Sequence, residues 1–204
     1  MKKTITGIFS LIAFISVSAQ DNDKLAELEK RVLELEKRIA VIESSSIRQS
    51  VETIAGQKAK EQQLKARQRM QKDLSVYSQE QLREIESLYQ IANRNWRSQE
   101  AKDSLKQLVA KYGYANRTGC ALLYLGQMSQ GNEREEYLKM AMDVFSDCYY
   151  GDGVQVGAYA RYYLAFYYRE NGQDDKAKEL FKEIKEKYPD AVDHKGRQLS
   201  ESIN

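Results

Sequence analysis

One stretch of the sequence, residues 158–191, constrains the fold more than any other. Small and large apolar side chains recur in it at helical spacings. The seven positions that define the pattern are Arg161, Leu164, Ala165, Tyr168, Ala177, Phe181 and Pro189, the last of which follows Tyr188. We expect Ala165 and Ala177 to lie where two antiparallel helices cross, because small side chains let helix axes approach closely. Asn171-Gly172 would end the first helix, since both residues tolerate the left-handed backbone of a C-cap. Pro189 would stop the second helix.

This pattern resembles a tetratricopeptide repeat, a helix–turn–helix unit of about 34 residues. About six of seven key positions match the pattern, and Arg161 departs from it because a bulky apolar residue is usual there. The resemblance implies a surface that binds other proteins and does not perform chemistry. One Pro and 11 Gly in 204 residues also suit a largely helical chain. We therefore predict an all-α fold, an N-terminal coiled coil followed by a short tetratricopeptide-like solenoid of helical hairpins.

Two weaker copies of the pattern precede this repeat, so that residues 78–204 form one predicted domain. We place the units at about 79–113, 119–150 and 158–191, followed by a C-terminal cap. In the second unit, Gly126 and Ala141 lie three residues further apart than Ala165 and Ala177 do in the third. The first unit shows the same excess, which predicts a longer turn between the helices of both earlier units. Three stacked units are about the minimum for a stable solenoid.

Residues 1–19 have the features of a secretory signal peptide. Lys2 and Lys3 form a basic start, Ile5–Val17 is an apolar run, and small residues lead to a cleavage site after Ala19. The apolar run is shorter than the roughly 20 residues that a membrane-spanning helix needs, so we expect cleavage and not an uncleaved anchor. The mature chain would be periplasmic or secreted, without a stable membrane anchor. Losing these two lysines lowers the formal net charge from +2 to 0, and a neutral chain is a poor candidate for binding nucleic acid.

Residues 20–45 carry a heptad repeat. Its apolar positions are Leu25, Leu28, Val32, Leu35, Ile39 and Ile42. Alternating spacings of three and four residues place them on one stripe, the seam of a coiled coil. Basic g and acidic e positions, such as Arg31 and Glu36, would pair between parallel chains, whereas antiparallel pairing would oppose like charges. Ile39 and Ile42 at positions a and d favour a homotrimer over a dimer. The alternative is a single amphipathic helix that packs on its own domain.

Residues 46–77 have the composition of a polar helical linker. Ser44–Ser46 would end the heptad helix, because Ser hydroxyls compete for backbone hydrogen bonds. From Arg48 to Asp73 there are seven basic residues and three acidic ones. This excess suits either a basic arm that contacts an anionic surface or a solvated connecting helix. The sparse apolar residues favour the connecting helix.

The two cysteines, Cys120 and Cys148, matter because an exported chain meets oxidants. Cys120 lies at the start of the first helix of the second unit, and Cys148 lies at the end of its second helix. These ends of an antiparallel helix pair are neighbours, so a disulfide is feasible and would stabilise the fold by roughly 3.5 kcal/mol in the chain-entropy model. Two buried free thiols are the equal alternative.

No constellation of residues in the sequence points to catalysis, a metal site or a cofactor. His194 is the one histidine, and it lies in a polar tail without neighbours at metal-ligand spacing, so we expect a solvated side chain. Gly151-Asp152-Gly153 lacks the further ligands of a calcium loop and is expected to form a turn. Phosphate loops, nucleophile elbows and paired-cysteine zinc motifs do not occur. We therefore expect a protein that is not an enzyme.

What remains is a surface for a protein or peptide partner. In tetratricopeptide repeats the first helices of the units line a concave groove, and the resemblance assigns to it Tyr159, Tyr162, Phe166 and Arg169 of the third unit and Leu123 and Gln127 of the second. Tyr and Arg are frequent anchors of binding hot spots. The alternative is that the aromatic residues only pack the solenoid or its cap, as we expect for Tyr163 and Tyr167.

The order of these segments resembles one known family, the periplasmic cell-division coordinators that work with the Tol–Pal system. The inter-repeat segment of that family is similar to Tyr112-Gly113-Tyr114-Ala115 followed by Leu123–Gln127, with Gly113 in place of the family's Pro. The resemblance implies a periplasmic scaffold linked to cell-wall synthesis and outer-membrane constriction. Two hypotheses follow. One is an oligomeric adaptor whose grooves bind a protein or peptide with avidity, and the other is a structural spacer that only self-associates.

Overall fold

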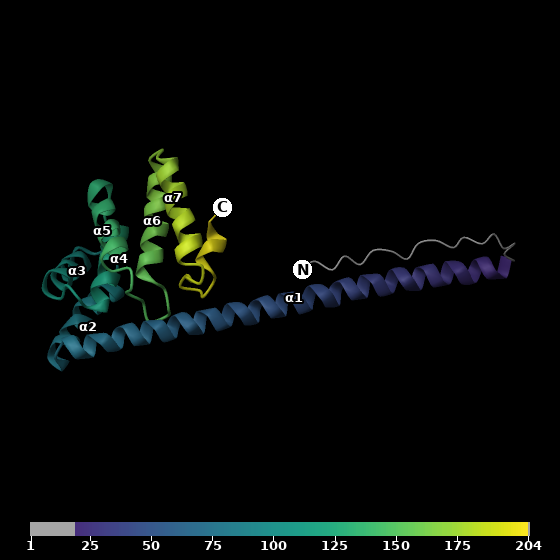
Figure 1. Ribbon diagram of the computed structural model, residues 1–204, viewed down its shortest axis with the longest axis horizontal. Helices are drawn as coiled ribbons and strands as arrows, with labels where there is room; N and C mark the ends of the chain where they lie inside the picture. The colour runs from purple at the N-terminus through teal and green to yellow at the C-terminus, as the bar shows by residue number, and fades with distance from the viewer. Residues whose placement is uncertain (1–18, 204) are drawn as a thin grey trace. The chain divides into compact units, whose positions relative to one another are not determined.

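The computed structural model describes the backbone of residues 19–203 and the side chains of residues 26–45 and 56–203. Of the predicted signal peptide, residues 1–18 lie outside this range. The described helices are α1 (Ala19–Val76), α2 (Gln79–Arg94), α3 (Gln99–Lys111), α4 (Asn116–Met128), α5 (Gly131–Asp143), α6 (Val156–Glu170), α7 (Asp174–Lys187) and the 3-10 helix η1 (Leu199–Ser202) (Figure 1). Between residues 19 and 203 no strand forms, and the sheet-like contacts are two isolated bridges. The predicted all-α fold is confirmed.

Helices α2 to α7 form three helical hairpins that stack into a short solenoid. α2 pairs with α3, α4 with α5 and α6 with α7, and each hairpin packs on the next through α3–α4 and α5–α6 contacts. All six helices belong to one compact unit, residues 51–204, while residues 1–50 form the other unit. α4 is the central helix, because it contacts α2, α3, α5 and α6 and nine of its 13 residues are buried.

Serine caps begin both helices of the first hairpin. Ser78 Oγ accepts a hydrogen bond from Gln81 N (3.2 Å), and Gln81 Oε1 accepts one from Ser78 N (2.9 Å), which together make a capping box. Ser98 Oγ accepts a hydrogen bond from Ala101 N (3.0 Å) at the start of α3. Each cap gives a partner to a backbone N–H that the helix start leaves free, and each stabilises the fold by about 1 kcal/mol.

Glycines allow the closest helix contacts of the solenoid. A Cβ placed on Gly157 of α6 would lie 2.7 Å from Ser146 Cα and 2.8 Å from Ser146 O, in the segment that follows α5. A Cβ on Gly126 of α4 would lie 2.6 Å from a methyl carbon of Leu138 on α5. At Gly157 the neighbouring atoms belong to the backbone, so this close approach requires glycine. At Gly126 the neighbour is the Leu138 side chain, which would have to shift to admit a methyl group.

The register predicted for the second unit is wrong. Its two helices are joined by only two residues, Ser129 and Gln130, against three residues between α6 and α7, so this turn is shorter and not longer. Gly126 packs on Leu138 and not beside Ala141. Helix α5 buries both Leu138 and Ala141, and an apolar pattern that extends over several turns does not tell which turn faces α4.

Helix α1 runs from Ala19 to Val76 without a break, so the predicted end at Ser44–Ser46 is also wrong. Ser44 Oγ donates to Val41 O (2.9 Å) and Ser45 Oγ donates to Ile42 O (2.8 Å). Both hydroxyls therefore bond to carbonyls of the preceding turn, and the helix continues past them. Among residues 19–203, no helix combines the length and the apolar character needed to cross a membrane.

The second half of α1 braces the turns between the hairpins. Asp73 is buried and accepts hydrogen bonds from Arg69 Nη1 (2.8 Å) and from the backbone N–H of Asn116 (2.9 Å), the first residue of α4. Arg69 also donates to Tyr114 O (3.0 Å) and pairs with Asp147 (3.1 Å) in the following turn. A single ion-paired cluster therefore fixes two successive turns to α1.

Other turns lie directly against the same part of α1 (Figure 1). A Cβ on Gly153, whose φ is 97°, would lie 2.9 Å from the backbone nitrogen of Gln63. Lys58 pairs with Asp190 at 3.1 Å, and Ala66 has no exposed surface. Residues 56–76 are thus neither a solvated connecting helix nor a free basic arm, because they pack along one side of the stacked hairpins.

A turn of the chain occurs twice with the same hydrogen bonds. The bridge between Tyr149 and Gln155 recurs between Val192 and Gln198, a shift of 43 residues. The same shift relates Tyr150 N–Val154 O to Asp193 N–Arg197 O, Val156 N–Cys148 O to Leu199 N–Ala191 O, and Gly153 N–Tyr150 O to Gly196 N–Asp193 O. η1 therefore begins as α6 begins, in the manner of the first helix of a fourth unit.

The glycine contacts lead to a stability prediction. Gly157→Ala should lower the free energy of unfolding by about 1–3 kcal/mol, because the added methyl group meets the Ser146 backbone, which cannot rotate away. Gly113→Ala is the matched control, because nothing lies within 4 Å of its Cβ position, and it should change stability by less than about 0.5 kcal/mol. Urea unfolding followed by circular dichroism measures both values. Equal stability of the two variants would contradict the proposed contact.

Candidate functional site

Four residues of α6 that the sequence predicted for a groove lie side by side on one face of the helix. The rings of Tyr159 and Tyr162 stack with centroids 5.8 Å apart, and those of Tyr162 and Phe166 lie 4.7 Å apart. The Arg169 guanidinium lies 4.4 Å above the Phe166 ring, in cation–π geometry. Spacings of three and four residues bring them together. We call Tyr159, Tyr162, Phe166 and Arg169 the α6 strip; its three aromatic rings are half-buried and Arg169 is exposed.

The two groove residues predicted on α4 lie elsewhere. Leu123 has no exposed surface and belongs to the hydrophobic core, so its assignment to a groove is wrong. The physical reason is that α4 is packed on several sides by other helices. Gln127 is half-buried, and its Nε2 donates to Leu123 O (3.3 Å). It borders a separate polar pocket between the turns of the first two hairpins, together with Arg97 and Arg134.

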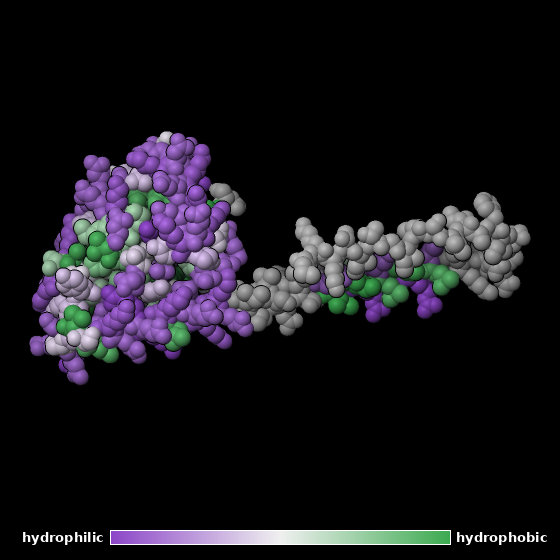
Figure 2. Space-filling model, in the orientation of Figure 1, coloured by the Kyte–Doolittle hydropathy of each residue, from purple (hydrophilic) through white to green (hydrophobic). Residues whose placement is uncertain are grey.

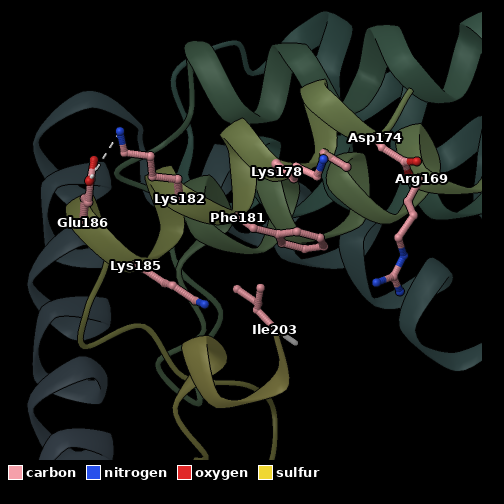
Figure 3. A pocket seen from close by; sticks show the side chains of 9 residues that line it. Arg169, Asp174, Lys178, Phe181, Lys182, Lys185, Glu186 and Ile203 are labelled. Carbon is pink, nitrogen blue, oxygen red and sulfur yellow. Dashed lines mark ion pairs between the residues drawn. The ribbon is translucent and has the colours of Figure 1, made fainter. Parts of the chain in front are cut away.

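A pocket of about 690 Å³ adjoins the α6 strip on the surface of α7 (Figure 3). Its apolar residues are Ala177, Phe181 and Ile203, and its rim carries Arg169, Lys178, Lys182, Lys185, Asp174 and Glu186. The Phe181 ring lies 5.3 Å from that of Phe166, so the strip and the pocket are continuous. Figure 3 shows Ile203 reaching from the C-terminal segment toward Phe181, with the lysine side chains spread around the opening.

The C-terminal segment covers the first half of the α6 strip. Ala158, Ile184, Ala191, Leu199 and Ile203 form a small buried cluster, against which Tyr159 and Tyr162 pack. Burial raises the pKa of the Tyr159 hydroxyl above its usual value. At Tyr159 and Tyr162, these contacts therefore favour the alternative that the aromatic residues only pack the solenoid or its cap. Phe166 and Arg169 do not pack in this cluster.

The single histidine joins the two copies of the repeated turn. His194 Nδ1 lies 2.7 Å from Asp152 Oδ2, and its ring meets Tyr150 and Tyr159 edge to face at 5.1 and 5.2 Å. Burial raises the pKa of Asp152, but the hydrogen bond and charge of His194 outweigh it and bring the pKa below its usual value. The side chain of His194 is 44% exposed, so it is half solvated and half packed.

Both cysteines are buried free thiols in the structure. Cys120 Sγ donates to Tyr149 O (3.4 Å), and Arg69 Nη2 lies 3.5 Å from Cys148 Sγ. Burial raises the pKa of the Cys148 thiol to about 12, and it raises that of Cys120 as well. Neither thiol supplies a thiolate nucleophile near neutral pH. The disulfide between them stays a prediction.

The first half of α1 presents an apolar stripe that the other described side chains leave exposed (Figure 2). The predicted seam residues Leu28, Val32, Leu35, Ile39 and Ile42 are 52–63% exposed. The side chain of Leu25 lies outside the described residues. A lone helix gains nothing from such a stripe, and contiguous exposed apolar surface marks an interaction site.

In the part of the chain whose side chains are described, no group of three or more His, Cys, Asp or Glu residues lies close enough to hold a metal ion. Two candidate binding surfaces, both apolar in part, stand out among the described residues. One is the α6 strip with the adjoining α7 pocket, and the other is the stripe on α1.

A comparison with protein-family models agrees with this description. The model of the tetratricopeptide repeat matches residues 159–191, which cover most of α6, all of α7 and the turn after it. This hairpin is therefore similar to a tetratricopeptide repeat. Repeats of this kind generally mediate protein–protein interaction. No curated protein and no solved structure matches the chain.

The polar pocket between the first two hairpins generates a pH prediction. Hydrogen bonds from Lys102, at 2.9 Å, and from neighbouring side chains hold the pKa of Glu133 at about 2, below the usual value of about 4.3. A lowered folded-state pKa stabilises the fold above the unfolded pKa, and this stabilisation is lost as the pH falls from about 4.3 toward 2.

Glu133→Gln should therefore flatten the dependence of the unfolding free energy on pH in this window. Lys102→Met, which removes the main cause, should flatten it in part, because Ser129 and Lys106 would still lower the pKa of Glu133 in the folded state. Urea unfolding at a series of pH values measures the slope. An unchanged slope in both variants would show that the ion pair does not form.

Proposed function

We propose that the protein is an exported, non-enzymatic adaptor that binds a protein or peptide partner through its C-terminal tetratricopeptide repeat. The observation that carries this function is the continuity of the α6 strip with the open α7 pocket. Aromatic rings stacked under an arginine resemble the anchors of binding hot spots. The strip lies on the hairpin that matches the repeat model, and repeats of this kind generally bind proteins.

The exposed stripe of α1 supports self-association into a parallel coiled-coil trimer. The stripe alternates in steps of three and four residues, and the charged flanks pair g with e between parallel chains, as Arg31 does with Glu36. A lone helix with this stripe exposed is marginal in water. Association would bring several copies of the repeat together, and linked sites gain avidity over a single one.

The setting that we propose for this adaptor is the bacterial cell envelope. Support comes from the secretory features of residues 1–19 and from the order of coiled coil and repeats, which resembles the Tol–Pal associated coordinators of cell division. A partner in that compartment would be an envelope protein. The Gly113 substitution and the short second turn separate this chain from the family pattern.

A structural spacer remains the second candidate, and one observation favours it. Tyr159 and Tyr162 are partly covered by the C-terminal segment of the same chain. If that packing were their whole role, substitutions along the strip would change stability but not the recovery of any partner. Arg169 separates the two functions, because it is exposed and contributes little to the core.

The adaptor function is tested by site-specific photocrosslinking in cells. A photoreactive residue at Arg169 should capture the same protein in repeated experiments. The same residue at Val144, which is 67% exposed on the second hairpin, should not. Adding Phe166→Ala to the Arg169 probe should reduce capture at least tenfold, equal to about 1.4 kcal/mol. Identical products from both probe positions, identified by mass spectrometry, would favour the spacer.

Self-association is tested with two variants that differ only in which face of α1 they change. Leu35→Glu places a charge on the seam and should convert the mature chain to a monomer at concentrations on the order of 10 μM. Leu33→Glu changes a residue of equal exposure, 52% against 53%, off the seam and should leave the oligomer intact. Sedimentation equilibrium gives the molar mass. A wild-type monomer, or equal effects of both variants, would reject the coiled coil.

A further inference from the structure

The repeated turn allows the surface of α7 to be compared, residue by residue, with the surface of α5. Under the shift of 43 residues that relates the two turns, Gly131–Asp143 of α5 corresponds to residues 174–186, which lie within α7. Leu138 corresponds to Phe181, and Ala141 corresponds to the fully buried Ile184. The surface of α7 is therefore the equivalent of the α5 surface on which α6 packs.

The second half of α6 covers the first half of α5. Tyr168 donates a hydrogen bond to Glu135 (2.8 Å), and Arg134 lies over the Tyr167 ring at 5.3 Å. Leu138, between these contacts and the Gly126 crossing, has no exposed surface. A first helix thus completes the core above the preceding second helix, as the stacking of a solenoid requires.

On α7 the described chain supplies only the beginning of such a cover. η1 occupies the place of the first turn of α6, and Ile203 corresponds to Ala160. Beyond Ile203 the shift of 43 residues places a helix over Ala177, Lys178 and Phe181, and the pocket of about 690 Å³ lies at that position. Within the described residues no side chain fills it, and Phe181 keeps part of its surface exposed where its counterpart Leu138 keeps none.

The charges around this pocket differ from those at the corresponding positions of α5. Glu135, which accepts the hydroxyl of Tyr168, corresponds to Lys178, and Met142 corresponds to Lys185. With Arg169 and Lys182, four basic side chains surround the pocket, against two acidic ones, Asp174 and Glu186. A basic rim around an apolar floor favours an acidic ligand with an apolar face.

We propose that the α7 pocket binds an amphipathic, acidic helix of a partner protein in the position of a fourth first helix. Its apolar stripe contacts Phe181 and Ile203, and its acidic flank pairs with Lys178, Lys182 and Lys185. The inference rests on the proposed adaptor function and names the class of partner. It is a helix-in-groove mode of recognition, in which the ligand completes the solenoid.

A second copy of the chain is a poorer occupant by the same charge argument. The first helix that a copy stacked end to end would bring to α7 is α2, whose Glu84 and Glu86 already pair with Lys111 and Arg117. The other charged residues of α2 are Glu80, Arg83 and Arg94, so this helix has no excess of acidic charge to offer the lysines of α7. The acidic partner helix therefore fits and the copy does not.

The test uses two synthetic helical peptides and the mature protein. Both peptides have about 14 residues, roughly four turns, and leucine at i, i+3, i+4 and i+7 spacing. One carries glutamate at the flanking positions and the other carries lysine. Fluorescence anisotropy should show binding of the acidic peptide at least about tenfold tighter than that of the basic one, and added salt should weaken it.

Charge reversal locates the site. Lys178→Glu with Lys182→Glu changes two side chains that are 76% and 72% exposed, so the fold is retained. This variant should lose the acidic peptide by about tenfold or more and gain the basic peptide. Lys65→Glu with Lys72→Glu makes the same change of charge on exposed positions of α1 and should leave binding within about twofold.

Each remaining outcome overturns the inference. Binding of both peptides with equal affinity, no binding of either, or equal losses in the two double variants would reject an acidic helix at α7. The occupant would be a second copy if the protein self-associates, the acidic peptide displaces this association, and Lys178→Glu with Lys182→Glu abolishes it. If the peptides fail while the Arg169 probe still captures a protein, the adaptor function stands and this inference alone falls.

Discussion

Direct backbone contact between successive hairpins sets the geometry on which the rest of the structure depends. At Gly157 the backbone of α6 lies so close to Ser146 that any side chain would be in contact at less than van der Waals distance. Tyr159, the first residue of the α6 strip, follows two positions later, so its position is fixed by that contact. A bulkier residue would move α6 as a rigid element and displace the strip relative to the turns that cover it.

A solenoid is held mainly by contacts between neighbouring units, so its ends move independently when nothing else joins them. In this chain the second half of α1 supplies the additional link. Arg69 reaches both Tyr114 and Asp147, which belong to different turns, and Asp73 binds the first residue of α4. Because Asp73 is buried, loss of Arg69 would leave its carboxylate without an opposite charge, which is more destabilising than replacing both residues with apolar ones.

The third hairpin and the α6 strip were predictable because both depend on local spacing. Four residues at steps of three and four share a helix face whatever surrounds the helix. Burial depends on neighbours that are distant in the sequence, as Leu123 shows. The sequence of α4 alone does not tell which other helices pack around it. The contacts of Arg69 and Asp73 with the turns between the hairpins were not predicted, for a related reason. These polar side chains find partners some 43 or 78 residues away, at Asn116 and Asp147, and no periodicity marks them.

In the proposed adaptor, the α7 pocket and the α1 stripe would make different contributions to recognition. Exposed lysines give little affinity, because water and salt screen them, but they discriminate between ligands of opposite charge. An open pocket with one large aromatic ring in its floor likewise supports only modest affinity for one helix. Several such pockets on one assembly bind a multivalent partner far more strongly, because each bound helix raises the effective concentration of the next. The selectivity for the ligand would then arise on α7, and the strength of binding would arise from association through α1. A change on α7 would alter the selectivity, whereas a change on α1 would alter the strength of binding.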